Sequence, residues 1–334
     1  MNSIKNNQLV LVDGSGYIFR AYYALPPMYN SDGVPVNAVF GFCNMLLKLI
    51  EDIQMEKGGN VSIAVIFDAA RKTFRNKIYP QYKANRADPP DDLKPQFDLI
   101  KKVPEFFNLK SIQSLGYEAD DLIASYAKEA VKKGRNVTII SSDKDLMQLL
   151  EDKISIIDPI KKKEIGIASV LEKFGVNPEK VIDVQALAGD PSDNIPGVPG
   201  IGPKIASQLI NEFGTLEKLL EGYETIKQEK RRQSIKENME LAILSKKLVT
   251  LKEDVPLPLP IDDLGYKPLE VKELIKFLDE MEFNRIKANV IARFGDPDAN
   301  KLKRKESSVV PSKFYIPERE RIDKNKYELI LESE

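Results

Sequence analysis

Short apolar runs alternate with longer amphipathic stretches over the first half of the chain. The runs are LVLV (9–12), VSIAVIF (61–67), LKSI (109–112), NVTII (136–140) and ISII (154–157). Their length and β-branched composition predict strands. The stretches between them, such as 38–53 and 121–134, carry apolar residues at helical spacing, and the second ends in the helix-terminating Gly134. Strands separated by helices predict right-handed crossovers and a mainly parallel sheet.

The pattern becomes helical in the second half of the chain. Helices are predicted over 181–189, 204–214, a long charged stretch near 226–247, and 267–283 after a proline-punctuated connector at 254–264. The closing residues are polar and basic, which predicts a linker, and they end on KYELILESE, which alternates like a strand. We therefore divide the chain into a sheet domain (1–165), a helical region (166–295) and a polar segment (296–334).

Composition places the chain among ordinary globular proteins. It has 334 residues, 42% of them hydrophobic and 30% charged, with a formal net charge of −1. The first apolar run breaks at Asp13, and no stretch approaches the roughly 20 apolar residues that span a bilayer. We expect a cytoplasmic protein with no membrane contact. The net charge gives no argument for nucleic-acid binding, so local charge has to carry that case.

The absence of histidine narrows the possible chemistry. The chain has no histidine and one cysteine, Cys43, whose neighbours GFCNMLLKLI predict a buried helix position rather than a nucleophile. The usual proton-transfer group and zinc sites built on imidazole or thiolate are therefore excluded. Catalysis would rest on carboxylates, lysines, tyrosines or hydroxyls. A metal would be a hard cation bound by oxygen, Mg²⁺ or Mn²⁺.

Acidic residues follow four of the predicted strands. They are Asp13, Asp68, the group Glu118, Asp120 and Asp121, and the pair Asp143 and Asp145. Ligands of parallel sheets bind beyond the carboxyl ends of the strands, so these acids should share one edge. Helix capping explains Asp120, Asp121 or Asp143 equally well when each is considered singly. The whole set would repel itself unless cations neutralised it, and a divalent metal is the simplest explanation.

Another acidic pair, Asp190 and Asp193, precedes a glycine-rich turn. Two groups of acids predict two metal ions, which at about 3.5–4 Å separation activate a water and stabilise a leaving oxygen.

The glycine-rich turn is itself a candidate anion site. Gly197, Gly200 and Gly202 stand immediately before a predicted helix, with Lys204 beside them. Such a turn presents backbone amides and a helix N-terminus to an anion. The alternative is a tight connection between helices. The pattern favours a helix-hairpin-helix that holds a duplex backbone regardless of sequence.

A basic run with interleaved aromatic residues follows Asp68. Residues 71–86 contain no acid and include Arg71, Lys72, Phe74, Arg75, Tyr82, Lys83 and Arg86. Positive charge with aromatic platforms is how proteins bind single strands irrespective of sequence. The alternative is a solvated basic loop. Its place directly after Asp68 favours binding, because substrate phosphates would meet both the basic run and the acids.

Six motifs resemble a known family. VDGSGYIFRAYYA, VIFDAARKTFR, YKANR, GYEADDLIA, SSDKDLMQLL and GDPSDNIPGVPGIGPKIA resemble, in order, the motifs of the 5′ nuclease (5′-3′ exonuclease) domain of bacterial DNA polymerase I, within the flap endonuclease superfamily. The resemblance implies an α/β fold with a mainly parallel sheet flanked by helices (PIN-like or resolvase-like), followed by a helix-hairpin-helix (H3TH) region. Ile205 and Ser142 depart from residues common in the family, and neither is an acid.

The resemblance also implies roles for individual residues. The first metal would be bound by Asp13, Asp68, Glu118 and Asp120, and the second site would be formed or bordered by Asp121, Asp143, Asp145, Asp190 and Asp193. The substrate strand would contact Tyr22, Arg75 and Tyr82, and also Arg20, Lys83 and Arg86, which would act in catalysis. K⁺ would bind at the hairpin.

The implied activity is hydrolysis of DNA at a 5′ flap, a nick or an RNA primer end, by a monomer. Residues 1–165 would be catalytic with a basic arch at 70–95, and 166–295 would bind DNA through a hairpin at 185–213. Residues 296–334 would link to a domain that this chain lacks, in a natural short form or the front of a longer protein. We expect no polymerase activity.

Two other functions remain as alternatives. A binding module for branched DNA would gain nothing from so many acids near phosphate. A PIN-class ribonuclease would have no evident use for the glycine hairpin and the long basic run. Metal dependence follows from the acids and the missing histidines, whereas the 5′ polarity rests on the family resemblance alone.

Overall fold

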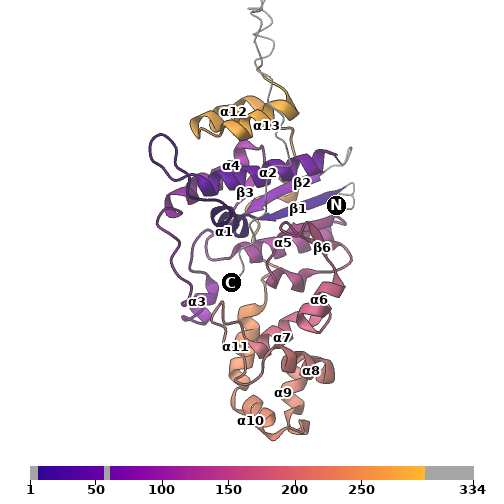
Figure 1. The fold of residues 1–334 in the computed structure, drawn as a ribbon. Coiled ribbons are helices and arrows are strands. Elements are labelled where there is room, and N and C mark those ends of the chain that lie inside the picture. The colour runs from indigo at the N-terminus through magenta and orange to yellow at the C-terminus, as the bar shows by residue number, and fades with distance from the viewer. Residues whose placement is uncertain (1–6, 56–60, 298–334) are drawn as a thin grey trace, which may run out of the picture.

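A six-stranded sheet forms the centre of the molecule in the computed structural model, which describes residues 7–55 and 61–297 (Figure 1). The strand order is β3-β2-β1-β4-β5-β6, and every neighbouring pair is parallel except β5 and β6. The strands are β1 (Gln8–Asp13), β2 (Val61–Ile66), β3 (Lys110–Ile112), β4 (Asn136–Ile140), β5 (Ile154–Asp158) and β6 (Lys163–Ile165).

Helices surround the sheet and form the rest of the described chain. The α-helices are α1 (Gly14–Ala24), α2 (Asn37–Met55), α3 (Phe74–Ile78), α4 (Phe97–Phe106), α5 (Ala119–Lys132), α6 (Ile167–Phe174), α7 (Val181–Ala188), α8 (Pro203–Phe213), α9 (Leu216–Gly222), α10 (Glu229–Glu237), α11 (Met239–Val249), α12 (Val271–Glu280) and α13 (Asn284–Phe294). Short 3₁₀ helices are η1 (Lys94–Gln96), η2 (Asp145–Leu149), η3 (Pro178–Lys180), η4 (Tyr223–Thr225) and η5 (Ile261–Leu264).

All five predicted strands are confirmed. The short sixth strand, β6, was not predicted, because three residues give too little periodicity to recognise. The order of the strands matters more for function than their bounds. From β1 the chain builds β2 and β3 on one side and then crosses to β4 and β5 on the other. This reversal lies at β1, and crevices at such switch points are where α/β sheets bind ligands.

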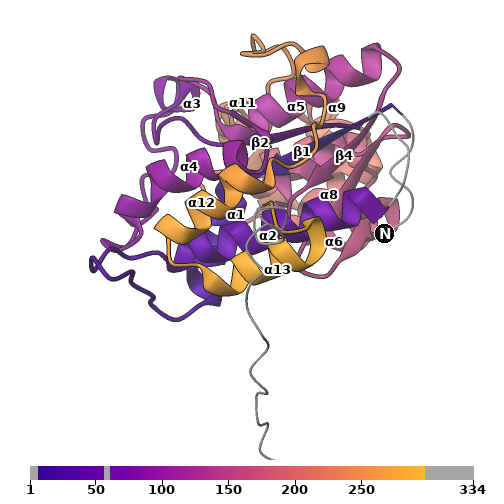
Figure 2. The same ribbon diagram turned by 90° about the horizontal axis from the view of Figure 1, so that it is seen from above.

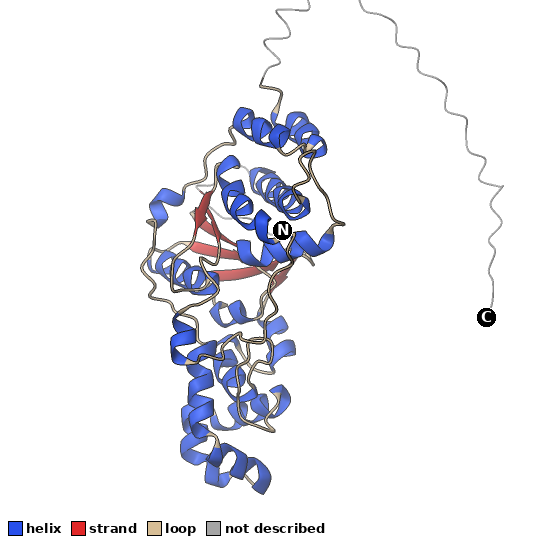
Figure 3. Ribbon diagram, turned by 90° about the vertical axis from the view of Figure 1, so that its left-hand side faces the viewer, coloured by secondary structure: helices blue, strands red, loops and turns tan. Residues whose placement is uncertain are grey.

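Alternate residues of β1 face two different helical layers. Leu9 and Leu11 belong to a core that includes α5 and continues into the helical region around α7 and α8. Val10 and Val12 belong to the opposite core, with α1, α2 and α4. Figure 3 shows the sheet between these layers, with the helical region extending below it. Because both faces are covered, every residue of β1 is buried.

The last two described helices return to the sheet domain. In Figure 2, α12 and α13 lie over α1, α2 and α4. Phe277 stacks on Phe106 with ring centroids 4.2 Å apart, and Phe283 meets Phe40 edge-on at 5.1 Å. Helices continue to Phe294 as predicted, but α12 and α13 pack on the sheet domain rather than on the rest of the predicted helical region 166–295. Amphipathic spacing shows that a helix has a partner but does not say which surface it packs against.

The prediction of one long charged helix near 226–247 is wrong, because the chain forms two helices that meet at Asn238. The backbone of Asn238 departs from helical geometry, and its side chain donates to the carbonyl of Ser234 at 2.7 Å. Asparagine competes for backbone hydrogen bonds in this way and disfavours helix interiors. The two helices also differ in burial: α10 buries only Ile235, whereas α11 packs on α7.

The proline-punctuated connector carries the chain back along α5. Val255 donates its amide to Ser125 at 2.9 Å, and the carbonyl of Leu259 accepts from the Tyr126 hydroxyl at 2.8 Å. Gly265 then pairs with Ser62 in β2. Within residues 7–55 and 61–297 no helix is long and apolar enough to cross a membrane. The predicted linker beyond residue 297 and its final strand lie outside the described residues.

We predict that the fold has no room for even a methyl side chain at Gly14. A Cβ there would lie 2.5 Å from the Phe67 ring and 2.9 Å from the carbonyl oxygen of Ile66. Gly14→Ala should lower the free energy of unfolding by about 1–3 kcal/mol, the usual cost of overpacking. Gly265→Ala is the control, since its Cβ would meet nothing within 4 Å. Urea unfolding measures the stability of both variants. Equal losses of unfolding free energy would contradict this prediction.

Candidate functional site

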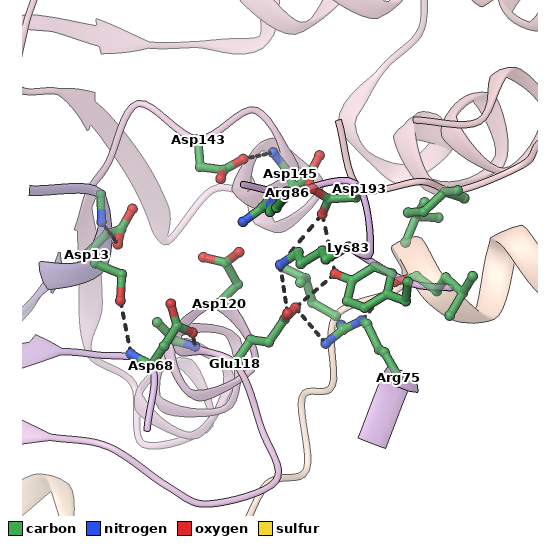
Figure 4. Close-up of a pocket in the computed structure, with 18 of the residues that line it drawn as sticks. Asp13, Asp68, Arg75, Lys83, Arg86, Glu118, Asp120, Asp143, Asp145 and Asp193 are labelled. Carbon is green, nitrogen blue, oxygen red and sulfur yellow. Dashed lines mark hydrogen bonds and ion pairs between the residues drawn. The ribbon is translucent and has the colours of Figure 1, made fainter. Parts of the chain in front are cut away.

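A pocket of about 160 Å³ opens at the carboxyl edge of the sheet. Seven acids line it, and Figure 4 shows them around one space: Asp13, Asp68, Glu118, Asp120, Asp143, Asp145 and Asp193. Since a water takes about 30 Å³ in the liquid, the pocket has room for several waters or small hydrated ions. The structure thus brings together the predicted acids except Asp121 and Asp190.

Asp13 ends β1 and also begins α1. One carboxylate oxygen accepts from the amide of Gly16 at 2.8 Å, and the other accepts from the Ser141 hydroxyl at 2.8 Å. A Cβ at Gly16 would lie 2.5 Å from the carboxylate, so glycine is needed for this tight cap. The cap and the strand end together fix where Asp13 points.

The other acids combine capping with lining of the pocket. Asp68 accepts from the amide of Ala119 at 2.8 Å and so caps α5, while Asp143 accepts from the amide of Asp145 at 2.8 Å. Asp120 makes no such bond among the described residues, and its carboxylate points into the pocket (Figure 4). Capping and a site role are therefore compatible at this edge.

The acids disturb one another's ionisation as like charges should. Burial raises the pKa of Asp13 to about 6, opposed by its bonds to Gly16 and Ser141 and assisted by the charges of Asp143 and Asp68. Burial and Asp143 likewise raise the pKa of Asp145 to about 6. The pKa of Asp120 is also raised, by burial first and then by Asp143 and Asp13. Such a group favours binding of positive charge.

Protein cations neutralise only one side of the pocket. The Lys83 ammonium lies 2.6 Å from Glu118 and 3.6 Å from Asp193, and Arg86 also pairs with Asp193. Lys83 has a left-handed backbone (φ 56°), fixed by its amide donating to the carbonyl of Asp193 at 2.9 Å. The five other pocket acids form no ion pair with any lysine or arginine in the described part of the chain; they are Asp13, Asp68, Asp120, Asp143 and Asp145.

Arg75 and Asp121 form a buried ion pair with each other. The Arg75 side chain is 1% exposed and uses all five guanidinium donors, to Asp121, Glu118 and the carbonyls of Leu248 and Thr250. Asp121 is fully buried and accepts both bonds of a bidentate pair at 2.7 Å. Arg75 lines the pocket with every donor engaged by protein groups, whereas Asp121 does not line it. The sequence does not show this ion pair, because its partners are more than 40 residues apart. The DNA contact of Arg75 and the metal-site role of Asp121 stay predictions.

Contacts within the protein hold three further predicted residues in place. Asp190 does not line the pocket, because Lys144 at 2.5 Å and the amide and hydroxyl of Ser192 hold its carboxylate within the turn. The Tyr82 ring is buried, and only its hydroxyl reaches the pocket, where it donates to Glu118 at 3.0 Å. Gly197 is packed against Gly189, with a Cβ that would lie 2.4 Å from the Gly189 nitrogen. It closes the turn rather than facing a ligand.

The other predicted strand-contacting residues lie outside the pocket. Arg20 is half-buried on α1, and the Tyr22 hydroxyl donates to Asp92 at 2.7 Å. Arg71 pairs with Asp88, and Lys72 is exposed. Phe74 lies beneath the Arg75 guanidinium, 4.6 Å from ring centre to carbon. Their contacts with DNA stay predictions.

Phe19 is a pocket residue that was not predicted. It lies on α1, is 42% exposed, and packs edge-on against Phe97 with ring centroids 6.2 Å apart. The available signal was spacing: Asp13, Gly16 and Phe19 recur every three residues, which places them on one side of a helix. An exposed aromatic ring at the rim of an acidic pocket can stack on a planar ligand group.

The remaining glycines of the turn leave their backbone open to solvent. Gly200 has φ 78°, and a Cβ at Gly200 or Gly202 would meet nothing within 4 Å. Gly202 caps α8, which begins at Pro203, and Lys204 is exposed beside it. The amides of Gly200, Gly202 and Lys204 find no acceptor in the described part of the chain. They are therefore available to a phosphate.

The carboxylate oxygens that line the pocket are suitable ligands for hard cations, but they do not form a closed cage. All its acidic ligands are carboxylate oxygens, the donors that Mg²⁺ and Mn²⁺ prefer. Across residues 7–55 and 61–297, no three acidic side chains converge closely enough to enclose an ion. The acids instead line the walls of one small space.

Two family models match nearly all of the described chain. Residues 8–175 match the N-terminal resolvase-like domain of 5′-3′ exonucleases, and residues 176–272 match their C-terminal SAM fold. A 5′-3′ exonuclease of Aquifex aeolicus is 38% identical over 278 residues, covering 83% of this chain and 93% of that protein.

Longer proteins and a solved structure match as well. A DNA polymerase I of Rhizobium leguminosarum is 51% identical over 301 residues, which cover 89% of this chain but 30% of that polymerase. The chain thus spans about a third of the length of the polymerases it matches. T5 5′-exonuclease, solved with bound zinc ions, has a TM-score of 0.61 and 26% identity, covering 82% of this chain and 98% of that one.

Removing the buried guanidinium should destabilise the fold strongly. Arg75→Met leaves Asp121 buried without its partner, and breaking such a pair costs about 3–5 kcal/mol of unfolding free energy. The double variant Arg75→Met/Asp121→Leu removes both charges and should recover part of that loss. Urea unfolding of the two variants measures this. A double variant no more stable than Arg75→Met would contradict the assignment.

Proposed function

The chain belongs to the 5′-3′ exonuclease family, and on that premise we propose that it hydrolyses DNA phosphodiesters at 5′ flaps, nicks and RNA primer ends with the help of two divalent cations. The family resemblance drawn from the six motifs is confirmed by both family models. The sheet and the helical region that follows it also have the fold of T5 5′-exonuclease. The hydrolytic activity, the substrate, the metals and the residue roles are proposals.

One observation carries this proposal. The pocket gathers seven acids at the switch point of the sheet, and the side formed by Asp13, Asp68 and Asp120 has no protein cation paired to it among the described residues. Burial and neighbouring acids raise the pKa values of Asp13 and Asp120, and a bound cation would relieve that repulsion. T5 5′-exonuclease was solved with divalent ions, which supports the same assignment here.

We assign the acids to two groups on either side of the pocket. Asp13, Asp68, Asp120 and Glu118 would hold one cation, and Asp143, Asp145 and Asp193 the other. When bound, divalent cations supply a water of lowered pKa and charge to stabilise the leaving oxygen. The physiological ion would be Mg²⁺ or Mn²⁺.

The protein's own cations would steer the phosphate. Lys83 and Arg86 stand at the pocket and are held there by Glu118 and Asp193. An arriving phosphodiester would share these cations with the acids, so charge developing on its oxygens would be stabilised without rearrangement. Phe19 at the rim would stack on the base next to the cut and hold the strand in line. The products would be a 5′ phosphate and a 3′ hydroxyl.

The glycine turn would hold the duplex beside the cut. Its free amides, the exposed Lys204 and the N-terminus of α8 all suit a backbone phosphate and read no base. The carbonyls of the same turn would hold K⁺, which would supply positive charge beside the duplex. The segment 70–95, pinned at Arg75, would act as the arch that receives the single strand. We propose that a monomer suffices.

Loss of one acid should abolish cleavage and spare binding. A 5′-flap duplex labelled at both ends, incubated in Mg²⁺ and in chelator, should be cut by the native protein in Mg²⁺ alone. Asp143→Ala should cleave at least about 10²–10³-fold more slowly, since one charge-stabilising group has that worth. Its affinity for the duplex in chelator should be unchanged. Asp152→Ala, an exposed acid outside the pocket, is the matched control.

Different results would favour the other functions. Tight binding by the native protein with no cleavage in Mg²⁺ would identify a branched-DNA-binding module. Cleavage of single-stranded RNA in preference to the flap duplex would identify a PIN-type ribonuclease.

Lys204 should contribute to affinity through charge alone. Lys204→Ala should weaken binding of every duplex sequence equally and reduce the slope of log K against log salt by about 0.9, the value for one phosphate contact. Lys272→Ala removes an exposed lysine on α12, away from the turn, and should leave the slope unchanged. Fluorescence anisotropy over a salt series measures both. Equal slopes for Lys204→Ala and the native protein would remove the turn from the interface.

A further inference from the structure

The short helix η2, which carries Asp145, is held by two glutamines. Gln148 donates to the carbonyls of Asp145 at 2.9 Å and Val249 at 3.1 Å, and it accepts from the amide of Leu251 at 3.1 Å. These bonds tie η2 to the end of α11. Gln185 reaches Asp145 from α7, and its amide nitrogen lies 2.6 Å from the carboxylate. Both glutamines therefore connect a pocket acid to the helical region.

Gln185 is an unusual residue for its position. Its side chain is 4% exposed, and its neighbours on α7 include the buried apolar residues Val184, Ala186 and Leu187. The oxygen of its side-chain amide is buried and has no hydrogen-bond partner in the described structure. A polar side chain buried with one unsatisfied atom costs stability, so packing alone does not account for a glutamine here.

Asp145 depends on this one side chain for its orientation. Lys144, the adjacent cation, points to Asp190 instead, and no other described side chain donates to the Asp145 carboxylate. The acids Asp143 and Asp193 face it and repel it. Because an ionised carboxylate only accepts hydrogen bonds, the amide nitrogen of Gln185 must be the atom that faces it.

We propose that Gln185 is a positioning residue that orients Asp145 for cation binding and makes that binding depend on the placement of α7. Helix α7 is bonded to the glycine turn, because the carbonyl of Leu187 accepts from the amide of Val198 at 2.8 Å. Through Gln185 the element that would hold the duplex also sets the geometry of the second group of acids. Hydrogen bonds that orient metal ligands in this way matter for affinity nearly as much as the ligands themselves. The inference rests on the proposed two-cation function.

The test measures binding of Mn²⁺ alone, without DNA, to the full chain. Gln185→Met keeps the length and helix preference of the side chain but removes the donor. Titration calorimetry and the electron paramagnetic resonance signal of free Mn²⁺ should show one of two sites weakened about 10–100-fold. Gln185→Asn keeps the amide but makes the side chain one methylene too short to reach Asp145. Its Mn²⁺ binding should therefore be weakened as in Gln185→Met. Gln233→Met, on the exposed side of α10, is the matched control and should bind as the native protein does.

Two further measurements separate positioning from general damage. The variants should keep the native melting temperature to within a few degrees and should bind flap duplex in chelator with native affinity. Native Mn²⁺ binding by both Gln185 variants would overturn the inference and leave the proposed function intact. Loss of duplex binding in chelator would overturn it as well, by showing that Gln185 merely supports α7. No Mn²⁺ binding by the native protein would overturn both the inference and the two-cation function.

Discussion

Repulsion among carboxylates is the constraint on which this structure depends. The strand order reverses at β1, and the parallel strands on both sides of it end side by side and deliver their acids to one edge. Burial and mutual charge raise the pKa values of Asp13, Asp120 and Asp145, so the edge is a place where positive charge stabilises the fold. Lys83 and Arg86 supply that charge on one side only. The same imbalance that strains the protein makes the pocket a site for cations.

Buried polar contacts transmit this constraint to the rest of the molecule. Arg75 joins the basic segment to the start of α5 and to the end of α11, with every guanidinium proton donated. Gln148 and Gln185 join η2 to α11 and α7. Partly satisfied buried networks are costly, whereas fully satisfied ones fix a single arrangement. The sheet domain and the helical region are thus held in register at the pocket and not only by their shared apolar core.

Several predicted residues have roles in the fold rather than at a ligand. Asp121, Asp190, Arg75 and Gly197 lie in the predicted motifs, and each is engaged by protein groups. Of these four residues, only Arg75 lines the pocket. Residues in a motif can support the site as well as form it. Phe19 is the reverse case, because it lines the pocket although neither charge nor a motif role singled it out.

The sequence alone determined the strands, the parallel sheet and the edge where the acids collect. These features follow from local rules: hydrophobic periodicity, and the fact that parallel strands share one carboxyl edge. Tertiary structure decided which acids face the pocket, that Arg75 is buried, that α12 and α13 return to the sheet, and that Gln185 reaches Asp145. Those outcomes depend on partners far apart in the chain, and no local pattern records which two surfaces will meet.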